Sequence, residues 1–523
     1  MPPYSMNAAA TPFPSVAVPG AEILSITAAP ILNYTETASS DFNYNHPTLQ
    51  ALGIDFCNVT ITYTHPGQND RVGVETWLPL DTWNGRIQSV GGGGWVAGRF
   101  FLSYQAMIGA IAEGYVTSSS DGGMRAKNGD AAFTPEDWAM VSEGNVNLYN
   151  LQNFGTVALH DQAILVKALT ETFYGQKHEY AYWSGCSQGG RQGLSLAQNY
   201  PDDYDGIAAA APAVNLPSLL ASSVYGHVLM QQGGVFPQGC EFEHIHQAVI
   251  AACDPLDGLV DGLISDEASC QFDPLSVVGQ SFICAETNTT TVVSQTAAEL
   301  TVAIWEGPKT PKNEFLWFGV NKDARLAGNG ASGTSGLPSG LAQTICQDGV
   351  CQAAPIGLGN LWLELFVQRN SSADWREHTL ETYAKLFQEG VRKFDGLLGT
   401  SNPDLSGFST AGGKMITYHG TADETIPFKQ SVHYYDQVIE KNAAVHDFYR
   451  LFEVPGLRHC SGGNGGQPTA VWEALVAWVE QGQAPDTVPI QVTNEFVDEE
   501  RTLRPYPSKP YSSEAGGCNS TSS

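Results

Sequence analysis

A serine between two glycines is the first feature of the sequence that indicates chemistry. Residues 185–189 read Gly-Cys-Ser-Gln-Gly, which fits the G-x-S-x-G pattern of a serine hydrolase with Ser187 as nucleophile. The pattern needs a strand before it and a helix after it, so that the serine projects from a sharp turn. The β-rich run YAYWSG precedes it, and the helical pattern GGRQGLSLAQNY follows it. The alternative is a buried serine in a structural turn.

Backbone N–H groups near this serine are expected to form an oxyanion hole. The first turn of the expected helix leaves N–H groups without intrahelical acceptors, and that of Gln188 would face a developing oxyanion. A second donor is expected in the glycine run GGGGW at 91–95, from either Gly92 or Gly93. The alternative for this run is a flexible turn.

The general base is expected near the C-terminal end, because α/β-hydrolases order their triad as serine, acid and histidine. His459 follows the last expected strand and precedes the final expected helix, in a loop rich in glycine and serine. The acid is expected after the preceding strand, where Asp423 is the first carboxylate of ITYHGTADETIP. Such an acid accepts the Nδ1–H of the histidine. The alternative is an ordinary loop carboxylate, and we interpret His419 as a structural or supporting residue.

Each of these two reactive residues has a cysteine as its neighbour. Cys186 precedes Ser187, and Cys460 follows His459. If the serine and the histidine are hydrogen-bonded, the two cysteines lie close enough for a disulfide. The closed loop would span 274 positions, for which the chain-entropy relation gives roughly 5–6 kcal/mol as an upper figure. We therefore expect a bond that fastens the loop of the base to the turn of the nucleophile.

The elements that must position these residues alternate along the chain. Strands are expected at 59–65, 71–79, 86–95, 115–121, 179–185, 204–215, 414–423 and 446–456, and helices at 103–114, 160–175, after Ser187 and at 469–482. This alternation predicts a mostly parallel, doubly wound α/β sheet, as in the α/β-hydrolase fold.

The alternation fails between about residues 216 and 410. Two helices, a threonine-rich stretch and a glycine- and serine-rich stretch replace it, and six of the ten cysteines lie there. We predict an α/β-hydrolase catalytic domain made of residues 1–215 and 411–523, with a large lid domain of residues 216–410 inserted between late strands. Insertion after a strand leaves the strand order of the sheet unchanged.

Composition narrows the classes of partner. The formal charge of −29, from 25 basic and 54 acidic residues, argues against nucleic acid and against an anionic membrane surface, since both bind basic surfaces. No apolar run is long enough to span a bilayer. The expected partner is a small-molecule ester, and a homodimer is one possible assembly.

Several features favour a secreted, extracellular glycoprotein. N-x-S/T triplets begin at Asn33, Asn58, Asn288, Asn370 and Asn519, and ten cysteines can pair completely in an oxidising compartment. The start, MPPYSMNAAATPFPSV, lacks the charged and apolar segments of a signal peptide. We interpret the signal as missing from this sequence, and an unusual route or no export is the alternative.

The combination of motifs resembles the tannase and feruloyl esterase family over nearly the whole chain. That family is marked by a Cys-Ser, an Asp and a His-Cys, with the two cysteines disulfide-linked, and Cys186-Ser187, Asp423 and His459-Cys460 match it. The resemblance implies hydrolysis of carboxylic esters of phenolic acids, with the lid forming much of the substrate pocket. A feruloyl esterase is the first expectation. Tannase and a tailoring esterase for a small secondary metabolite are alternatives, and a non-catalytic, calcium-stabilised secreted glycoprotein is the alternative from another class.

An acidic segment, CDPLDGLVDGLISDEASC at 253–270, indicates a metal site. Asp254, Asp257 and Asp261 supply hard oxygen ligands of the kind that Ca²⁺ prefers, although their spacing is not that of an EF-hand. The alternative is a solvated acidic turn.

The resemblance implies more about this segment. It implies a structural Ca²⁺ in the lid, held by the three aspartates and by the backbone carbonyls at the Leu259 and Leu263 positions, with Cys253 and Cys270 disulfide-linked. The ion would stabilise the lid and take no part in the chemistry. The other six cysteines allow 15 pairings, among which the sequence does not choose: Cys57, Cys240, Cys284, Cys346, Cys351 and Cys518.

Overall fold

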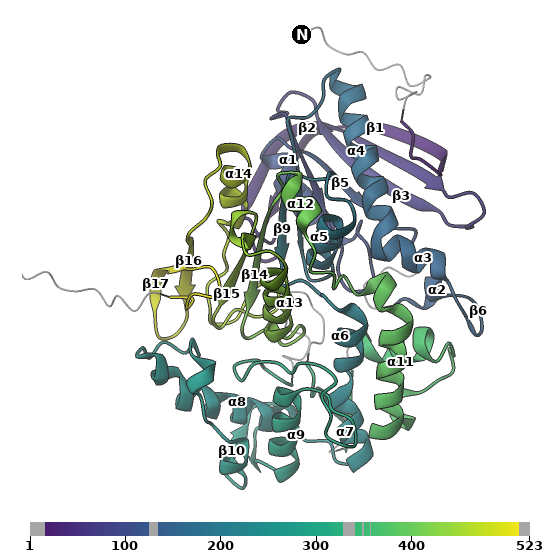
Figure 1. Cartoon of the computed structure of the whole chain (residues 1–523). Helices are drawn as coiled ribbons and strands as arrows, with labels where there is room; N and C mark the ends of the chain where they lie inside the picture. Colours follow the sequence, from purple (N-terminus) through teal and green to yellow (C-terminus); the bar gives the residue numbers. More distant parts are fainter. Residues whose placement is uncertain (1–15, 125–133, 328–339, 348–349, 356, 512–523) are drawn as a thin grey trace, which may run out of the picture.

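The fold is built around a nine-stranded sheet. The computed structural model describes residues 16–124, 134–327, 340–347, 350–355 and 357–511 of the chain. Its spatial order is β1-β2-β3-β5-β4-β8-β9-β14-β15 (Figure 1). The strands are β1 (Glu22–Ala38), β2 (Leu49–Thr64), β3 (Val72–Pro79), β4 (Arg86–Val90), β5 (Val116–Ser120), β8 (Tyr180–Cys186), β9 (Gly206–Ala210), β14 (Lys414–Gly420) and β15 (Tyr449–Val454).

The sheet is antiparallel at one edge and parallel elsewhere. Strands β1, β2, β3 and β5 pair antiparallel, whereas β5, β4, β8, β9, β14 and β15 pair parallel. Strands β5 and β9 are buried along their whole length, as is typical of parallel strands covered on both faces. Strand β1 is largely exposed, and its long pairing with β2 was not predicted.

Helices cover both faces of the sheet. They are α1 (Phe101–Ala112), α4 (Ala158–Tyr174), α5 (Gln188–Asn199), α13 (Phe428–Lys441) and α14 (Val471–Gln481). Helices α4, α5 and α13 share one buried apolar cluster with the strands, for example through Leu165, Leu194 and Tyr435. Helix α14 packs on the other face through Trp472 and Leu475. The predicted α/β-hydrolase class is therefore confirmed: the sheet is mixed, mostly parallel and doubly wound.

Within the described residues, the segment between β9 and β14 contains sixteen elements, of which α7, α8, α9 and β10 lie together at the end of the molecule away from β1 and β2 (Figure 1). The elements are α6 (Leu216–Ser222), α7 (Tyr225–Gly233), α8 (Gly239–Cys253), η2 (Asp254–Asp257), η3 (Glu267–Ser269), η4 (Pro274–Val277), β10 (Ser281–Cys284), β11 (Thr289–Val292), α9 (Gln295–Glu306), β12 (Thr344–Gln347), β13 (Val350–Ala353), α10 (Gly359–Leu361), η6 (Trp362–Val367), η7 (Trp375–Glu377), α11 (Leu380–Leu398) and α12 (Ser406–Thr410).

This segment has an apolar core of its own and also shares one with the sheet domain. Phe242 of α8 and Ala297 of α9 belong to a cluster formed within the segment. Leu216 of α6 and Phe394 of α11 pack in a different cluster with Trp95, which precedes α1. The division into domains at residues 215 and 410 remains a prediction.

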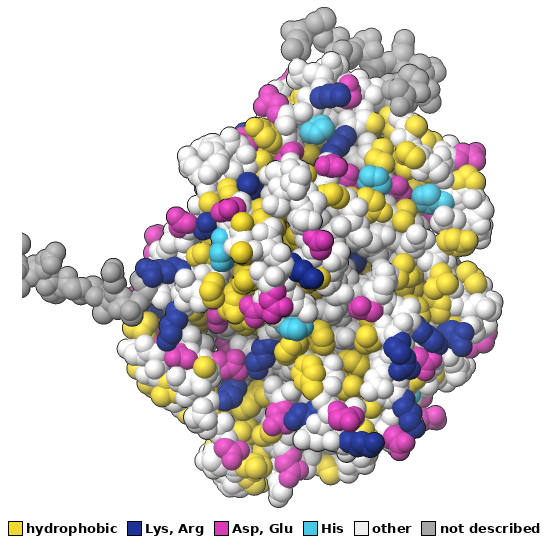
Figure 2. Space-filling model, in the orientation of Figure 1, with side chains coloured by type: hydrophobic (Ala, Val, Ile, Leu, Met, Phe, Trp, Pro, Cys, Tyr) yellow, Lys and Arg dark blue, Asp and Glu magenta, His cyan; other side chains and the backbone are white. Residues whose placement is uncertain are grey.

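Two further regions complete the chain. Short elements connect β5 to α4, and a C-terminal hairpin follows α14. The elements of the first region are α2 (Glu136–Ala139), β6 (Met140–Ser142), β7 (Asn145–Val146), α3 (Leu148–Gln152) and the π-helix η1 (Asn153–Val157), and the hairpin consists of β16 (Val488–Thr493) and β17 (Asp498–Leu503). A short 3₁₀-helix, η8 (Val445–Asp447), lies between α13 and β15. None of the helices within the described residues has the length and apolar content that crossing a bilayer requires. Figure 2 shows acidic and basic side chains interspersed over one face.

Candidate active site

Ser187 lies at the sharp turn between β8 and α5, where the motif predicts it. Its backbone has φ 62° and ψ −120°, a strained conformation that the surrounding structure must enforce. A Cβ atom at Gly185 would lie 2.5 Å from the carbonyl carbon of Gly189. Because any side chain at position 185 would collide with that backbone, this turn requires glycine there.

Asp423 and His459 are in contact, in the loops that follow β14 and β15. His459 Nδ1 lies 2.8 Å from Oδ2 of Asp423, whose side chain is fully buried. The other carboxylate oxygen, Oδ1, accepts the N–H groups of Thr425 at 2.9 Å and Ile426 at 2.7 Å. An ionised carboxylate only accepts, so Nδ1 carries the proton. Nε2 is then the basic nitrogen, as a general base requires.

A second histidine, His419, holds the same carboxylate from another side. Its Nε2 lies 3.1 Å from Oδ2 of Asp423 and 3.0 Å from the carbonyl oxygen of Ile426. Both are acceptors, so Nε2–H donates, and Nδ1 accepts the hydroxyl of Ser431 at 2.8 Å. His419 therefore donates from Nε2 and fixes Asp423 in position.

The acid and the base shift each other's titration in opposite directions. Burial by itself would raise the pKa of Asp423, but the charge of His459 and the hydrogen bonds from both histidines hold it well below its usual range. Burial would lower the pKa of His459, but the charge and hydrogen bond of Asp423 raise it above its ordinary value of 6.5. The pair therefore favours an ionised acid beside a histidine that protonates readily.

The disulfide between Cys186 and Cys460 brings the base to the nucleophile. The two Cα atoms are 6.0 Å apart, and each cysteine adjoins one reactive residue. His459 Nε2 lies 3.7 Å from Sγ of Cys460, and the described part of the chain contains no hydrogen bond between it and Ser187 Oγ. Catalytic hydrogen bonds are often long in free enzymes and shorten when substrate binds.

The two glycines predicted for the oxyanion hole already donate their backbone N–H groups to other acceptors. Gly92 donates its N–H to Oε1 of Gln192 at 2.9 Å, and Gly93 donates its N–H to the carbonyl of Val96 at 3.2 Å. Neither amide is available to an oxyanion, which corrects the prediction. The next glycine of the run, Gly94, has φ 54° and lines the hollow beside Ser187.

Gln192 of α5 is a supporting residue that sequence reasoning missed. Its carboxamide accepts from Gly92 and donates from Nε2 to the carbonyl of Ala97 at 2.9 Å, and it is fully buried. One side chain therefore ties the glycine run to the helix that begins at the serine. The signal in the sequence is a polar pair, Arg191-Gln192, between the glycines at the start of the helix.

Arg191, the other missed residue, is a fully buried cation. Its guanidinium donates to Oε1 of Gln188 at 2.8 Å, to the carbonyls of Phe154 at 2.8 Å and Gly155 at 3.2 Å, and to the hydroxyl of Thr400 at 3.0 Å. Burial lowers its pKa to about 9. It fastens the start of α5 to η1 and to the loop before α12.

A mainly apolar hollow opens beside Ser187. Six apolar side chains line it together with the serine: Ala213, Leu216, Leu219, Leu220, Leu358 and Ile426. A second hollow shares Leu219, Ser223 and Thr425 with the first and extends to Tyr225 and Phe318. The two hollows are therefore neighbours along one wall.

The acidic segment forms a closed loop around its own backbone. The carboxylate of Asp254 accepts the N–H groups of Asp261 and Gly262, both at 3.0 Å, and Cys253 is bonded to Cys270. Oδ2 of Asp257 is buried and has no hydrogen-bond donor among the described residues. A buried carboxylate oxygen without a donor suits a cation. The set of three aspartates and two carbonyls therefore fits Ca²⁺ chemically.

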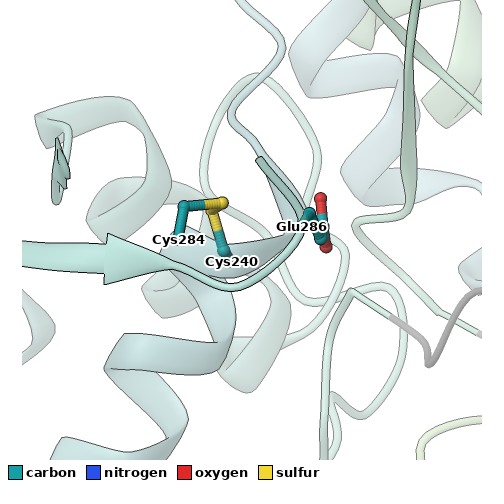
Figure 3. Close-up of side chains that lie close together, drawn as sticks. All are labelled: Cys240, Cys284 and Glu286. Atoms are coloured by element: carbon teal, nitrogen blue, oxygen red, sulfur yellow. A yellow bond between two sulfur atoms is a disulfide. The ribbon is translucent and has the colours of Figure 1, made fainter. Parts of the chain in front are cut away.

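Two observations limit that fit. Oδ2 of Asp261 pairs with Nη1 of Arg501 at 2.6 Å, so one carboxylate already faces a cation from β17. Among the described residues, the one set of three His, Cys, Asp or Glu side chains with ligand atoms within 4.8 Å of one another is Cys240, Cys284 and Glu286 (Figure 3). Cys240 and Cys284 form a disulfide and offer no thiolate, so that set is no metal centre.

The structure gives two of the disulfide pairings that the sequence left open, of which Cys240–Cys284 is described above. Cys346 is bonded to Cys351, and Cys57 is buried without a disulfide partner within the described residues. Cys518 lies outside them.

Comparison with known sequences relates most of the chain to one family. Residues 57–523 match the family model described as "Tannase and feruloyl esterase". A protein of Arthroderma benhamiae described as "Probable feruloyl esterase" is 40% identical over 483 residues, covering 91% of this chain and 85% of its own. The "Tannase" of Aspergillus oryzae is 28% identical over 545 residues, covering 93% and 86%.

Solved structures agree with these matches. A tannin acyl hydrolase from Aspergillus niger superposes with a TM-score of 0.84 at 28% identity, covering 96% of this chain and 92% of its own. Feruloyl esterase B from Aspergillus oryzae superposes with a TM-score of 0.74 at 26% identity, covering 94% of each chain.

Proposed function

Because the chain belongs to the tannase and feruloyl esterase family, we propose that Ser187, His459 and Asp423 are the catalytic triad with which this carboxylic ester hydrolase cleaves esters of hydroxycinnamic acids. One observation carries the proposal. His459, which pairs with the buried Asp423, belongs to a loop that a disulfide joins to the residue before Ser187.

The reaction proceeds in two halves. His459 Nε2 takes the proton of Ser187 as Oγ attacks the ester carbonyl, and Asp423 stabilises the imidazolium that forms. Collapse of the tetrahedral intermediate breaks the bond to the alcohol, which leaves with the proton from His459. Water then attacks the acyl-enzyme by the same route and releases the acid.

Backbone amides stabilise the oxyanion. Among the described residues the N–H of Gln188 has no acceptor, and it stands at the first position of α5, where the helix dipole also favours negative charge. Gly94, which lines the hollow with Ser187, is the glycine of the run that we assign as second donor. Gln192 holds that run in place.

The acyl group occupies the apolar hollow beside Ser187. A hydroxycinnamoyl group places a two-carbon vinylene spacer between the carbonyl and the ring, whereas in a galloyl group the ring is attached directly to the carbonyl. The second hollow, which continues along the same wall to Tyr225 and Phe318, suits a ring displaced by such a spacer. This continuity favours hydroxycinnamoyl over galloyl esters.

Two measurements test these assignments. Ser187→Ala is expected to abolish hydrolysis of methyl ferulate, and a serine-directed phosphonate is expected to label Ser187 in the unmodified enzyme. For the acyl group, methyl vanillate is the matched control, because it carries the ring of ferulate without the spacer. Hydrolysis by Ser187→Ala contradicts the mechanism, and a kcat/KM for methyl vanillate or methyl gallate above that for methyl ferulate contradicts the acyl assignment.

A structural calcium ion in the inserted segment is a further part of the proposal. Asp254, Asp257 and Asp261 would hold it, with the carbonyls of Leu259 and Leu263. The ion would neutralise the carboxylates and stiffen the loop closed by Cys253 and Cys270. It has no step in the ester chemistry.

Secretion with N-linked glycans is also proposed. Asn33, Asn288 and Asn370 are exposed. Asn58 is half-buried, and its Nδ2 donates to Oε1 of Glu75 at 2.9 Å, which opposes glycan attachment there. Asn519 lies outside the described residues. A second copy of the chain as partner stays a prediction.

A further inference from the structure

A polar cavity of about 230 Å³ adjoins the loops of the acid and the base. Ala422, which precedes Asp423, and Arg458, which precedes His459, line it. Thr425 and Ile426, from the same loop as Asp423, line the apolar hollow at Ser187 instead. The loop from 422 to 426 therefore stands between two hollows of opposite character.

Three basic side chains share the polar cavity. They are His246 of α8, Arg325 from the loop after α9, and Arg458. Nδ1 of His246 and Nε of Arg458 are buried and have no hydrogen-bond partner among the described residues. Unpaired buried polar atoms are costly, so these two nitrogens favour a polar ligand, and Nε of Arg458, which only donates, favours one that supplies an acceptor.

Acidic side chains lie beside this cluster. Glu424 pairs with Nη2 of Arg458 at 2.6 Å, and Glu243 lies 3.6 Å from Nη2 of Arg325 at a partly exposed position. Asp323 also lines the cavity and accepts the hydroxyl of Thr421 at 2.6 Å. Burial raises the pKa of Asp323 to about 7, so below that pH this carboxyl carries a proton and can donate as well.

The acyl part and the alcohol part of a bound ester extend from the carbonyl carbon in different directions. If the acyl half fills the apolar hollow at Ser187, the alcohol half extends from the side on which His459 protonates it. We infer that the cavity lined by His246, Arg325 and Arg458 receives the alcohol half of the substrate and that this half carries a carboxylate. The inference rests on the proposed function, because it assumes that Ser187 is the nucleophile.

Guanidinium groups favour a carboxylate over a neutral polyol as the ligand. An arginine only donates, and two arginines with a neutral histidine give the cavity an excess of N–H donors. Charge-assisted hydrogen bonds to a carboxylate are roughly twice as strong as neutral ones. A sugar hydroxyl would both donate and accept, and so would leave part of this donor set unmatched.

A matched pair of esters tests the inference. The ferulate ester of glycolic acid has a free carboxylate at the alcohol end, and in the methyl ester of the same compound that carboxylate is masked; release of ferulate is measured for both. The chain carries a formal charge of −29, which would repel the anionic ester in the absence of a dedicated site. We expect kcat/KM to be about tenfold higher for the anionic ester at low ionic strength, the size of one charge-assisted hydrogen bond.

Arg325→Gln is the informative variant, because Arg325 belongs to the loop after α9 and not to the loops of the acid and the base. The ratio of kcat/KM between the anionic and the neutral ester is expected to fall about tenfold in this variant. Arg376→Gln is the control, since it removes the same charge from an exposed position on η7. Hydrolysis of the neutral ester by each variant shows that it is folded.

Two results overturn the inference. One is a wild-type ratio at or below one, and the other is a ratio that Arg325→Gln leaves unchanged. Failure of the wild-type enzyme to hydrolyse the neutral ester would contradict the proposed function itself. Activity on the neutral ester therefore distinguishes failure of this inference from failure of the proposed function.

Discussion

Cys186 and Cys460, 274 positions apart in the sequence, are joined by a disulfide that links the nucleophile's turn to the loop of the base. Ser187, beside one cysteine, has φ 62°, and Cys460 itself has φ 65°. Two residues with unfavourable backbone conformations are therefore held on either side of one covalent bond.

We predict that Cys186→Ala combined with Cys460→Ala lowers both stability and activity. Opening the long loop is expected to cost roughly 2–5 kcal/mol in the free energy of unfolding, measured in urea. At a temperature where the variant remains folded, kcat/KM is expected to fall further than unfolding explains, because the two strained residues relax.

Cys346→Ala with Cys351→Ala is the matched control, since that bond closes a separation of only 5 positions away from the site. It is expected to cost much less stability and to leave kcat/KM unchanged. Full specific activity in the folded Cys186/Cys460 variant would contradict the bracing role.

The second prediction concerns pH. His459 must be neutral to take the proton of Ser187, and its pKa is raised by Asp423 above 6.5. Activity is therefore lost as pH falls through that raised value, so the acid limb of kcat/KM lies above 6.5.

Asp423→Asn removes the charge that raises the pKa of His459. We expect the acid limb to move to lower pH, with a fall in kcat of about 10⁴-fold because the histidine loses its orienting acceptor. Asp404→Asn, which removes an exposed carboxylate elsewhere, is expected to leave the limb in place. An acid limb that stays unmoved in Asp423→Asn would argue against direct coupling of the pair.

The third prediction concerns Gln192. Gln192→Met keeps the length of the side chain but removes the hydrogen bond from Gly92 of the glycine run and the one to Ala97, which follows the run. We expect kcat to fall by about tenfold to a hundredfold with little change in KM, because a displaced oxyanion donor acts in the transition state.

Gln198→Met is the control for this variant. Gln198 lies on the same helix and makes two hydrogen bonds from Nε2, to Thr400 and Tyr434, without touching the glycine run. Equal losses of kcat in the two variants would show that Gln192 acts on stability alone.

The fourth prediction concerns the acidic loop. If Ca²⁺ binds the folded loop, the unfolding midpoint rises with calcium concentration, by an amount equivalent to about 2.7 kcal/mol at 100 times the Kd. Calorimetry after chelation and after calcium return measures this.

Asp257→Asn is expected to abolish that response, since it removes the buried carboxylate oxygen that has no donor. Asp273→Asn, at the exposed start of η4, is expected to keep it. A midpoint independent of calcium in the wild-type protein would contradict the site.

Much of the fold could be predicted because its signals are local. The strands β8 and β14 are short apolar runs, and Ser187 and His459 each stand in a distinctive loop with a cysteine beside them. The pairing of Cys186 with Cys460 followed because two local patterns had to meet in one site.

The rest depended on contacts that no local pattern encodes. Gly92 seemed free to bind an oxyanion, but Gln192, 100 positions later, takes its N–H. Arg191 is buried among carbonyl oxygens of η1, which the sequence places far from it. The pairing of Cys240 with Cys284 depends in the same way on how α8 and β10 pack.

The order in which the cysteines are synthesised determines when the bond between Cys186 and Cys460 can form. At about 5–20 residues per second, a ribosome needs roughly 14–55 s to advance from one of these cysteines to the other. All six cysteines of the three other disulfides emerge in that interval, so each of them meets Cys186 as a free thiol. The three short-range bonds can therefore close before Cys460 is made, and the active site becomes covalently complete only near the end of translation.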